Sequence, residues 1–201
     1  MRLKEKVSII TGAASGFGEG IAKKFSEEGA KLILVDINKD LLEKVSKDLN
    51  QDFFHTDVSN ASSMKKLSEY VLKKYRTIDI MVNNAGITHL PKPLEEVEEE
   101  EFDKVFAVNS KSVFLCGKFF VPHMKKQKKG SILNIASTAG ISPRPNLNWY
   151  NASKGWMITA TKTMAVELAP FNVRVNSLAP VAGETPLLKS FLGEDTPERR
   201  N

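Results

Sequence analysis

Tyr150 and Lys154 lie four residues apart in the segment YNASK, where a helix pattern begins. Residues at this spacing share one face of a helix, with Cβ atoms about 5–6 Å apart. A phenol with an ordinary pKa of about 10 is a poor base at neutral pH, and a nearby ammonium favours the phenolate. The pair therefore predicts a general acid/base, Tyr150, whose pKa is lowered by Lys154. An ordinary amphipathic pair is the alternative interpretation.

A serine at the end of a predicted strand could share this site. Ser137 closes the apolar run SILNIAS, thirteen residues before Tyr150. Its hydroxyl could hydrogen-bond a substrate oxygen and fix the geometry for proton transfer. A turn or helix cap is the alternative, because serine often bonds nearby backbone groups.

Glycines cluster where the first predicted strand leads into a helix. Gly12, Gly16 and Gly18 follow the run VSIIT within TGAASGFGEG. Glycine allows a tight turn and lets the backbone approach a pyrophosphate, while the helix N-terminus offers unpaired N–H groups. No Gly-Lys-Ser/Thr follows, so this is not a Walker A loop. The pattern predicts a dinucleotide site, with a plain turn as the alternative.

Two aspartates end the next two predicted strands. Asp36 closes KLILVD, eighteen residues after Gly18, where a carboxylate can accept hydrogen bonds from both hydroxyls of an adenosine ribose. It would repel a 2′-phosphate, and neither Ser15 nor Ile37 supplies a cation, so NAD is favoured over NADP. Asp57 could reach an adenine amino group or could simply cap a turn or helix.

Apolar runs alternate with helix-like segments along the whole chain. The predicted strands are 7–11, 31–36, 52–57, 78–86, 131–137 and 173–180, and the predicted helices are 17–28, 39–48, 60–75, 95–126 and 150–168. This alternation predicts an α/β fold of the Rossmann type, a doubly wound parallel sheet with helices on both faces. We expect a single domain over 1–201, with 181–201 forming part of a substrate lid. The carboxyl ends of the strands should meet at one ligand crevice.

Five features that meet at this crevice resemble the short-chain dehydrogenase/reductase family over essentially the whole chain. They are the turn TGAASGFG, the motif NNAG at 83–86, Ser137, YxxxK as YNASK, and Asn109 in FAVNS. The resemblance implies an NAD-dependent enzyme that interconverts a secondary alcohol and a ketone by hydride transfer. The sequence is most similar to members that resemble 3-oxoacyl-carrier-protein reductases or sugar dehydrogenases. The former usually prefer NADPH, which Asp36 argues against.

The resemblance also implies roles for individual residues. Lys154 would hold the nicotinamide ribose, Asn109 would support a water chain that relays protons to Lys154, and Thr185 would contact the nicotinamide carboxamide. Asn109 could instead bond only a helix backbone. The residues expected to bind the cofactor are Gly12, Ser15, Gly16, Phe17, Gly18, Asp36, Asp57, Val58, Asn84, Ala85, Gly86, Tyr150, Lys154, Pro180 and Thr185.

The chain departs from the family pattern at two places. Val181 follows Pro180 where the family usually has glycine, which stiffens the entrance to the lid. Family members usually continue beyond the position of Asn201, with another helix and a seventh strand. We therefore expect a truncated chain that binds NAD weakly and turns over poorly, with an exposed apolar edge at its last strand.

Composition excludes several other classes. The 201 residues carry a net charge of +5, but the lysines are mixed with glutamate along polar helix faces, which argues against nucleic-acid binding. No apolar run approaches the ~18–20 residues of a membrane span.

The single cysteine, Cys116, lies in an apolar stretch and predicts a buried thiol and a cytoplasmic location. The histidines lack metal-ligand spacing, so no metal site is expected, and a solvated His89 is favoured over one that faces a ligand.

The substrate should be a small alcohol or ketone held between loops. Segments 87–98 and 138–148 are expected to bound its pocket, because loops set specificity in such folds. Arg144 in the second segment could meet an anionic substrate, although an exposed loop arginine is the favoured interpretation.

Apolar residues on more than one face of helices 95–126 and 150–168 predict a homodimer or homotetramer through these helices. A non-catalytic NAD-binding sensor or scaffold on the same fold is the alternative function. The intact set of Ser137, Tyr150 and Lys154 argues against it.

Overall fold

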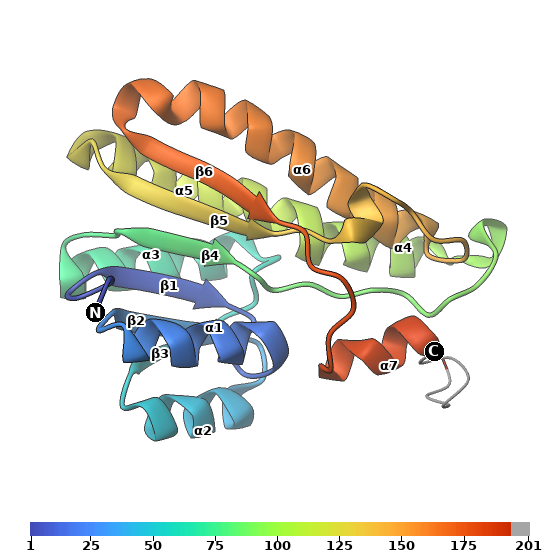
Figure 1. Cartoon of the computed structure of the whole chain (residues 1–201), viewed down its shortest axis with the longest axis horizontal. Coiled ribbons are helices and arrows are strands. Elements are labelled where there is room, and N and C mark those ends of the chain that lie inside the picture. Colours follow the sequence, from blue (N-terminus) through green and yellow to red (C-terminus); the bar gives the residue numbers. More distant parts are fainter. Residues whose placement is uncertain (194–201) are drawn as a thin grey trace.

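The computed structural model describes residues 1–193, and its six strands form one parallel sheet between two layers of helices (Figure 1). The strand order is β3-β2-β1-β4-β5-β6, the doubly wound arrangement that the sequence predicts. The strands are β1 Val7–Thr11, β2 Lys31–Asp36, β3 Asp52–His55, β4 Ile80–Asn83, β5 Gly130–Ile135 and β6 Val173–Leu178. The α-helices are α1 Gly16–Glu27, α2 Lys39–Leu49, α3 Ala61–Tyr75, α4 Glu99–Phe106, α5 Ser112–Gln127, α6 Asn148–Leu168 and α7 Pro186–Leu192.

Helices cover both faces of the sheet, with α1 and α2 on one side and α3, α5 and α6 on the other (Figure 1). Consecutive residues of a strand point to opposite faces. Ile9 accordingly packs in a cluster with Phe120 of α5 and Leu168 of α6, whereas Ile10 packs in a second cluster with Leu42 of α2. This double coverage explains why the central strands are apolar at nearly every position.

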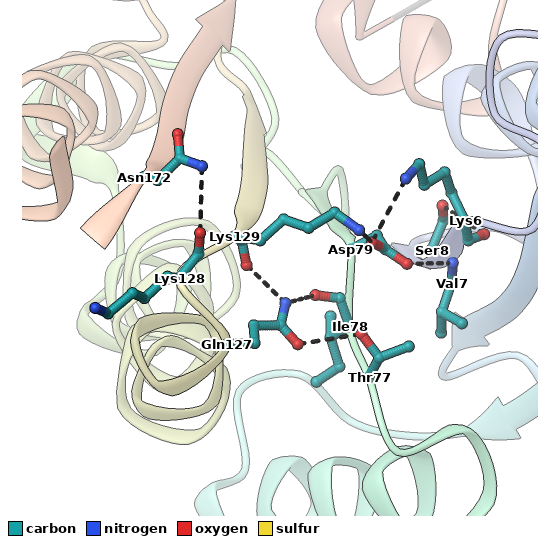
Figure 2. Close-up of polar contacts among 10 residues, drawn as sticks. All are labelled: Lys6, Val7, Ser8, Thr77, Ile78, Asp79, Gln127, Lys128, Lys129 and Asn172. Carbon is teal, nitrogen blue, oxygen red and sulfur yellow. Dashed lines mark hydrogen bonds and ion pairs between the residues drawn. The ribbon is translucent and has the colours of Figure 1, made fainter. Parts of the chain in front are cut away.

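A buried carboxylate fastens the amino ends of three neighbouring strands. Asp79 accepts hydrogen bonds from the Val7 amide at 3.0 Å and from the Lys129 ammonium, and its carboxylate lies 4.0 Å from the Lys6 ammonium (Figure 2). Its own amide donates to the Val7 carbonyl, and its carbonyl accepts from the Ser131 amide, both at 2.9 Å. Asp79 therefore ties β1, β4 and β5 together at the end of the sheet from which these parallel strands begin.

Four predicted strands end earlier than expected. The segments 84–86, 136–137 and 179–180 leave the sheet after Asn83, Ile135 and Leu178, and β3 ends at His55. Each of these strands ends at the carboxyl edge of the sheet, where the chain continues as a loop. Apolar composition alone therefore overestimated the strand lengths. Strand β6 lies at the edge of the described sheet, with Val173 buried and Arg174 exposed.

The predicted helix 95–126 is not a single regular helix. A 3₁₀ turn at Leu94–Glu96 precedes α4, and a π-helical turn at Ala107–Lys111 joins α4 to α5. A π turn adds one residue to the helix and is frequent at functional sites. No glycine or proline lies in this turn, so the sequence pattern does not reveal it.

Candidate active site

A cavity of about 520 Å³ lies at the carboxyl ends of the strands. Its lining comes from the β1–α1 turn, the ends of β2, β4 and β5, the first turns of α6, and the segment from Pro180 to Phe191. All but two of the sequence-predicted site residues line it. The exceptions are Gly18 and Asn109, which are buried behind its wall.

The glycine turn leaves no room for side chains. Gly12 has φ of 64°, a left-handed conformation that favours glycine, and a Cβ on Gly18 would lie 1.9 Å from the Gly12 carbonyl oxygen. The Asn84 amide group donates to the carbonyls of Thr11 and Gly12 at 2.9 and 3.2 Å. This bracing holds the backbone in the close approach that a pyrophosphate requires at the start of α1.

The residues that follow Gly12 also belong to the cavity wall. Ser15 is the N-cap of α1 but makes no capping bond with its side chain, and Phe17 is 42% exposed. Thr185 packs against the turn, because a Cβ on Gly16 would lie 3.1 Å from the Thr185 Cβ. Ala85 and Pro180 also line the cavity, together with Val181, which replaces the glycine usual in the family.

The two aspartates occupy different local roles. Asp36 accepts from the Ala14 amide at 3.0 Å with one oxygen and from the Asn38 amide at 2.9 Å with the other, and it remains on the cavity wall. Asp57 accepts from both the amide and the hydroxyl of Ser59, which is the turn role that its alternative interpretation predicts. Asp57 and the buried Val58 still line the cavity, so the structure is compatible with both interpretations of Asp57.

Tyr150 and Lys154 are both buried beside the end of β5. The Lys154 ammonium donates to the Ile135 carbonyl at 2.8 Å and lies 5.8 Å from the centre of the Tyr150 ring. Burial lowers the pKa of Lys154 from 10.5 to about 8. Burial raises the pKa of Tyr150, against a smaller lowering by the Ser137 hydrogen bond. The net direction for Tyr150 is therefore opposite to the lowered pKa expected from the sequence, because desolvation outweighs the stabilisation of the phenolate.

Ser137 caps a short helix and also lines the cavity. Its hydroxyl oxygen accepts from the Ala139 amide at 3.1 Å, which caps the short 3₁₀ helix Thr138–Gly140. The same side chain lines the cavity and faces Tyr150, whose pKa it lowers. The cap thus holds the Ser137 hydroxyl beside Tyr150.

Asn109 sits in the π-helical turn and is fully buried. Its side chain accepts from the Ile87 amide and donates to the Ile87 carbonyl and to the Ser153 hydroxyl, each at 2.9 Å. A Cβ on Gly86 would lie 3.3 Å from both Asn109 Oδ1 and Lys154 Nζ. Asn109 therefore fixes the chain after NNAG beside the lysine, and its backbone bonding matches the alternative interpretation of this residue.

The sequence analysis missed several polar side chains that hold the site in place. The Thr11 hydroxyl accepts from the Asn84 and Ala85 amides at 3.0 and 3.1 Å, which ties β1 to the NNAG segment. A buried chain of amide and hydroxyl groups runs from Asn83 through Asn134 to Thr161, with both hydrogen bonds at 2.8 Å. Polar residues at the carboxyl ends of otherwise apolar strands are the sequence signal that could have indicated these bonds.

Cys116 and His89 are not among the residues that line the cavity. Cys116 is buried as predicted, and burial raises the pKa of its thiol to about 12. The prediction of a solvated His89 is wrong, because His89 is buried and its Nδ1 lies 2.8 Å from the Leu90 carbonyl. Within residues 1–193, no three His, Cys, Asp or Glu side chains are grouped to hold a metal ion. In the same range, no helix has the length and hydropathy to cross a bilayer.

Known proteins resemble the chain over nearly its whole length. The short chain dehydrogenase family matches residues 6–195. The chain is 40% identical to the 4-formylbenzenesulfonate dehydrogenase of Comamonas testosteroni over 206 residues, covering 100% of this chain and 82% of that protein. It is 43% identical to the 3-oxoacyl-[acyl-carrier-protein] reductase of Thermotoga maritima, covering 95% of this chain and 79% of that protein.

Solved structures give the same result. The 3-ketoacyl-(acyl-carrier-protein) reductase of Brucella melitensis, complexed with NADH, superposes with a TM-score of 0.92 at 46% identity, covering 94% of this chain and 80% of that one. A short chain dehydrogenase/reductase of Burkholderia phymatum, in complex with NAD, gives a TM-score of 0.90 at 30% identity, covering 100% of this chain and 74% of that one.

The fold and the cavity define a Rossmann-type oxidoreductase that uses a nicotinamide cofactor. The chain belongs to the short-chain dehydrogenase/reductase family and is an enzyme that acts on CH–OH groups. Members of this family generally bind small-molecule substrates and form oligomers.

Proposed function

We propose that this protein is an NAD-dependent oxidoreductase that interconverts a secondary alcohol and a ketone, with Tyr150 as its general acid/base. One observation carries the proposal: Ser137, Tyr150 and Lys154 line the same cavity as the glycine turn and Asp36. That arrangement joins a proton donor to a dinucleotide cradle within one cavity. The names of the relatives, which are dehydrogenases and reductases, support the same reaction class.

Tyr150 would protonate the substrate oxygen during reduction and accept its proton during oxidation. Because burial raises its pKa, the phenol keeps its proton at neutral pH and is ready to act as an acid. Lys154, with a pKa of about 8, is mostly charged at pH 7 and would limit the cost of forming the phenolate. Ser137 would donate a hydrogen bond to the same substrate oxygen and orient it.

The residues around the glycine turn fit a dinucleotide. The start of α1 and the bracing of the glycine turn by Asn84 suit a pyrophosphate, and Asp36 suits a ribose diol. Lys154, Asn84, Gly86 and Thr185 would hold the nicotinamide half of the cofactor. When bound, the nicotinamide would donate or accept the hydride.

Asp36 favours NAD over NADP, because its carboxylate would repel a 2′-phosphate. The exchange Asp36→Ser should therefore raise the affinity for NADPH and lower that for NADH. Isothermal titration with both cofactors measures this, and an unchanged ratio of the two dissociation constants would contradict the assignment.

A panel of ketones and secondary alcohols, followed by NADH absorbance, tests the reaction itself. Tyr150→Phe should abolish turnover while NADH still binds, because the ring and its packing remain and only the proton is lost. Tyr75→Phe, remote from the cavity, is the matched control and should keep its activity. A sensor or scaffold protein would instead show no turnover in the wild-type chain and no response to Tyr150→Phe.

We also propose a homo-oligomer formed through α5 and α6. Phe114 on α5 is 55% exposed, and Trp156 and Val166 on α6 are 41% and 79% exposed, so both helices present large apolar side chains to solvent. Such patches on a soluble chain favour a partner of the same kind. Sedimentation at micromolar concentration tests this, and a monomer would contradict it.

A further inference from the structure

The charged groups that line the cavity divide between its two sides. The acids, Asp36 and Asp57, follow β2 and β3 on one side of the central strand β1. The bases other than Lys154 are Lys104 of α4 and Arg144 of the loop before α6, and both belong to the side of β4, β5 and β6. The half of the cavity that would hold the substrate therefore carries positive charge and no lining carboxylate.

Both cations lack a bonding partner within the part of the chain that the structure describes. Within residues 1–193, neither the Lys104 ammonium nor the Arg144 guanidinium makes a hydrogen bond or ion pair, and both side chains are exposed. Glu101, one turn before Lys104, is instead paired with Lys92 at 2.7 Å. The Arg144 backbone is nevertheless fixed, because its carbonyl accepts from Asn151 Nδ2 at 2.7 Å.

The fixed backbone matters because Asn151 follows Tyr150 directly in α6. Arg144 is thereby anchored to the helix that carries the proton donor, and its side chain remains available at the cavity wall. Lys104 lies four residues before Val108 on the same helical stretch, and both residues line the cavity. Two cations from separate elements thus border the same space.

Several walls of the same cavity are apolar. Val108, Leu147 and Leu187 line the cavity, and the Phe191 ring packs edge-on against the Tyr150 ring at 5.0 Å between centres. A ligand with its carbonyl at Tyr150 would place an apolar body against these walls. Any group that it carries beyond that body would meet the positive side chains.

We propose that the substrate carries an anionic group, a carboxylate, sulfonate or phosphate, separated from its reacting carbon by an apolar segment and bound by Arg144 and Lys104. This inference rests on the proposed function and names the substrate class of the same site. Arginine pairs with such anions through a planar fork, and lysine adds a point charge. The structure bears out the exposed loop position that the sequence predicts for Arg144, and the proposal adds a ligand-binding role to it.

Matched carbonyl pairs test the proposal. Each pair has the same shape and differs in charge: 4-acetylbenzoate against 4-acetylbenzamide, and 4-oxopentanoate against 4-oxopentanamide. We expect kcat/KM to favour the anion of at least one pair by about tenfold, the range of one solvent-accessible charge-assisted contact. Arg144→Gln and Lys104→Gln should each reduce this preference several-fold.

Lys66→Gln is the control for general charge effects, since Lys66 is an exposed lysine of α3 that does not line the cavity. It should leave the preference as it is. Equal kcat/KM for anions and amides, or a preference that survives the Arg144→Gln/Lys104→Gln double variant, would overturn the proposal.

Calorimetric binding of the same compounds to the NAD-loaded protein separates this inference from the proposed function. Anion-selective binding that the double variant loses, without any turnover, would support the anion site and refute the oxidoreductase mechanism. Turnover of neutral ketones without selectivity for anions would support the oxidoreductase mechanism and refute the anion site. Binding that does not discriminate charge, in the absence of turnover, would overturn both.

Discussion

Replacing Lys154 by methionine should stabilise the fold while it removes activity. Lys154 is 4% exposed, and burial lowers its pKa from 10.5 to about 8. At about 1.4 kcal/mol per pH unit, the charged form costs the folded state about 3 kcal/mol at pH 7. Methionine has a similar length and no charge, but it leaves the Ile135 carbonyl without its donor, which costs about 1–2 kcal/mol. We therefore expect a net gain of about 1–2 kcal/mol in the free energy of unfolding.

The pH dependence distinguishes this explanation from a simple packing effect. Between pH 8 and 10.5 the unfolded wild-type chain binds more protons at Lys154 than the folded one, so wild-type stability rises with pH in this window. Below pH 8 both states are charged and the penalty is complete; above 10.5 both are neutral and it is gone. The advantage of Lys154→Met should therefore shrink as the pH rises from 8 toward 10.

Urea unfolding at pH 7, 8, 9 and 10 measures this difference, with Lys66→Met as a control at an exposed lysine. Titratable groups that the wild type and the variant share contribute equally to the pH dependence of unfolding, so their contributions cancel in the stability difference. A stability difference that stays constant from pH 7 to 10 would refute the reasoning, because the buried charge would then not be its source.

Three further perturbations test other parts of the structure. Asp79→Ala should lower the free energy of unfolding by about 3 kcal/mol in urea, because it leaves two lysines and the Val7 amide without their acceptor; a loss below about 1 kcal/mol would contradict this. Gly18→Ala should weaken NADH binding at least about tenfold by fluorescence titration, since its Cβ would lie 1.9 Å from the Gly12 oxygen; unchanged affinity would show that the turn adapts. Asp52→Asn should cost about 1 kcal/mol at pH 7, because burial raises the pKa of Asp52 but hydrogen bonds from Lys74 and two tyrosine hydroxyls together outweigh it and lower that pKa. That cost should vanish as pH falls through this lowered pKa, and a constant cost in acid would argue against the ion pair.

The sequence predicted the sheet and the contents of the cavity because both depend on local signals. Strand and helix periodicity fixed the alternation of elements, and the parallel sheet follows from that alternation. The glycine turn, Asp36 and the Tyr150–Lys154 pair each lie next to a strand or helix end, so their convergence follows from topology. Residues far apart in the chain could thus be assigned to one site.

Other features depend on packing that no local pattern encodes. The direction of the Tyr150 pKa is set by how much of its ring is buried, including contact with Phe191 from a distant helix. The π turn around Asn109 satisfies the backbone of Ile87, a partner 22 residues away. Likewise, Lys104 and Arg144 become neighbours of one cavity only through the folded positions of α4 and the loop before α6.

The Asp79 cluster has a practical consequence for anyone who alters this protein. It lies at the amino ends of the strands, whereas the proposed reacting groups lie at their carboxyl ends, with the length of β4 between them. Heat tolerance and substrate choice should thus be adjustable by separate sets of mutations. Mutations that reinforce the contacts around Asp79 at the amino ends of the strands would raise the stability of the fold. The loops at the carboxyl ends could be changed separately to alter substrate specificity.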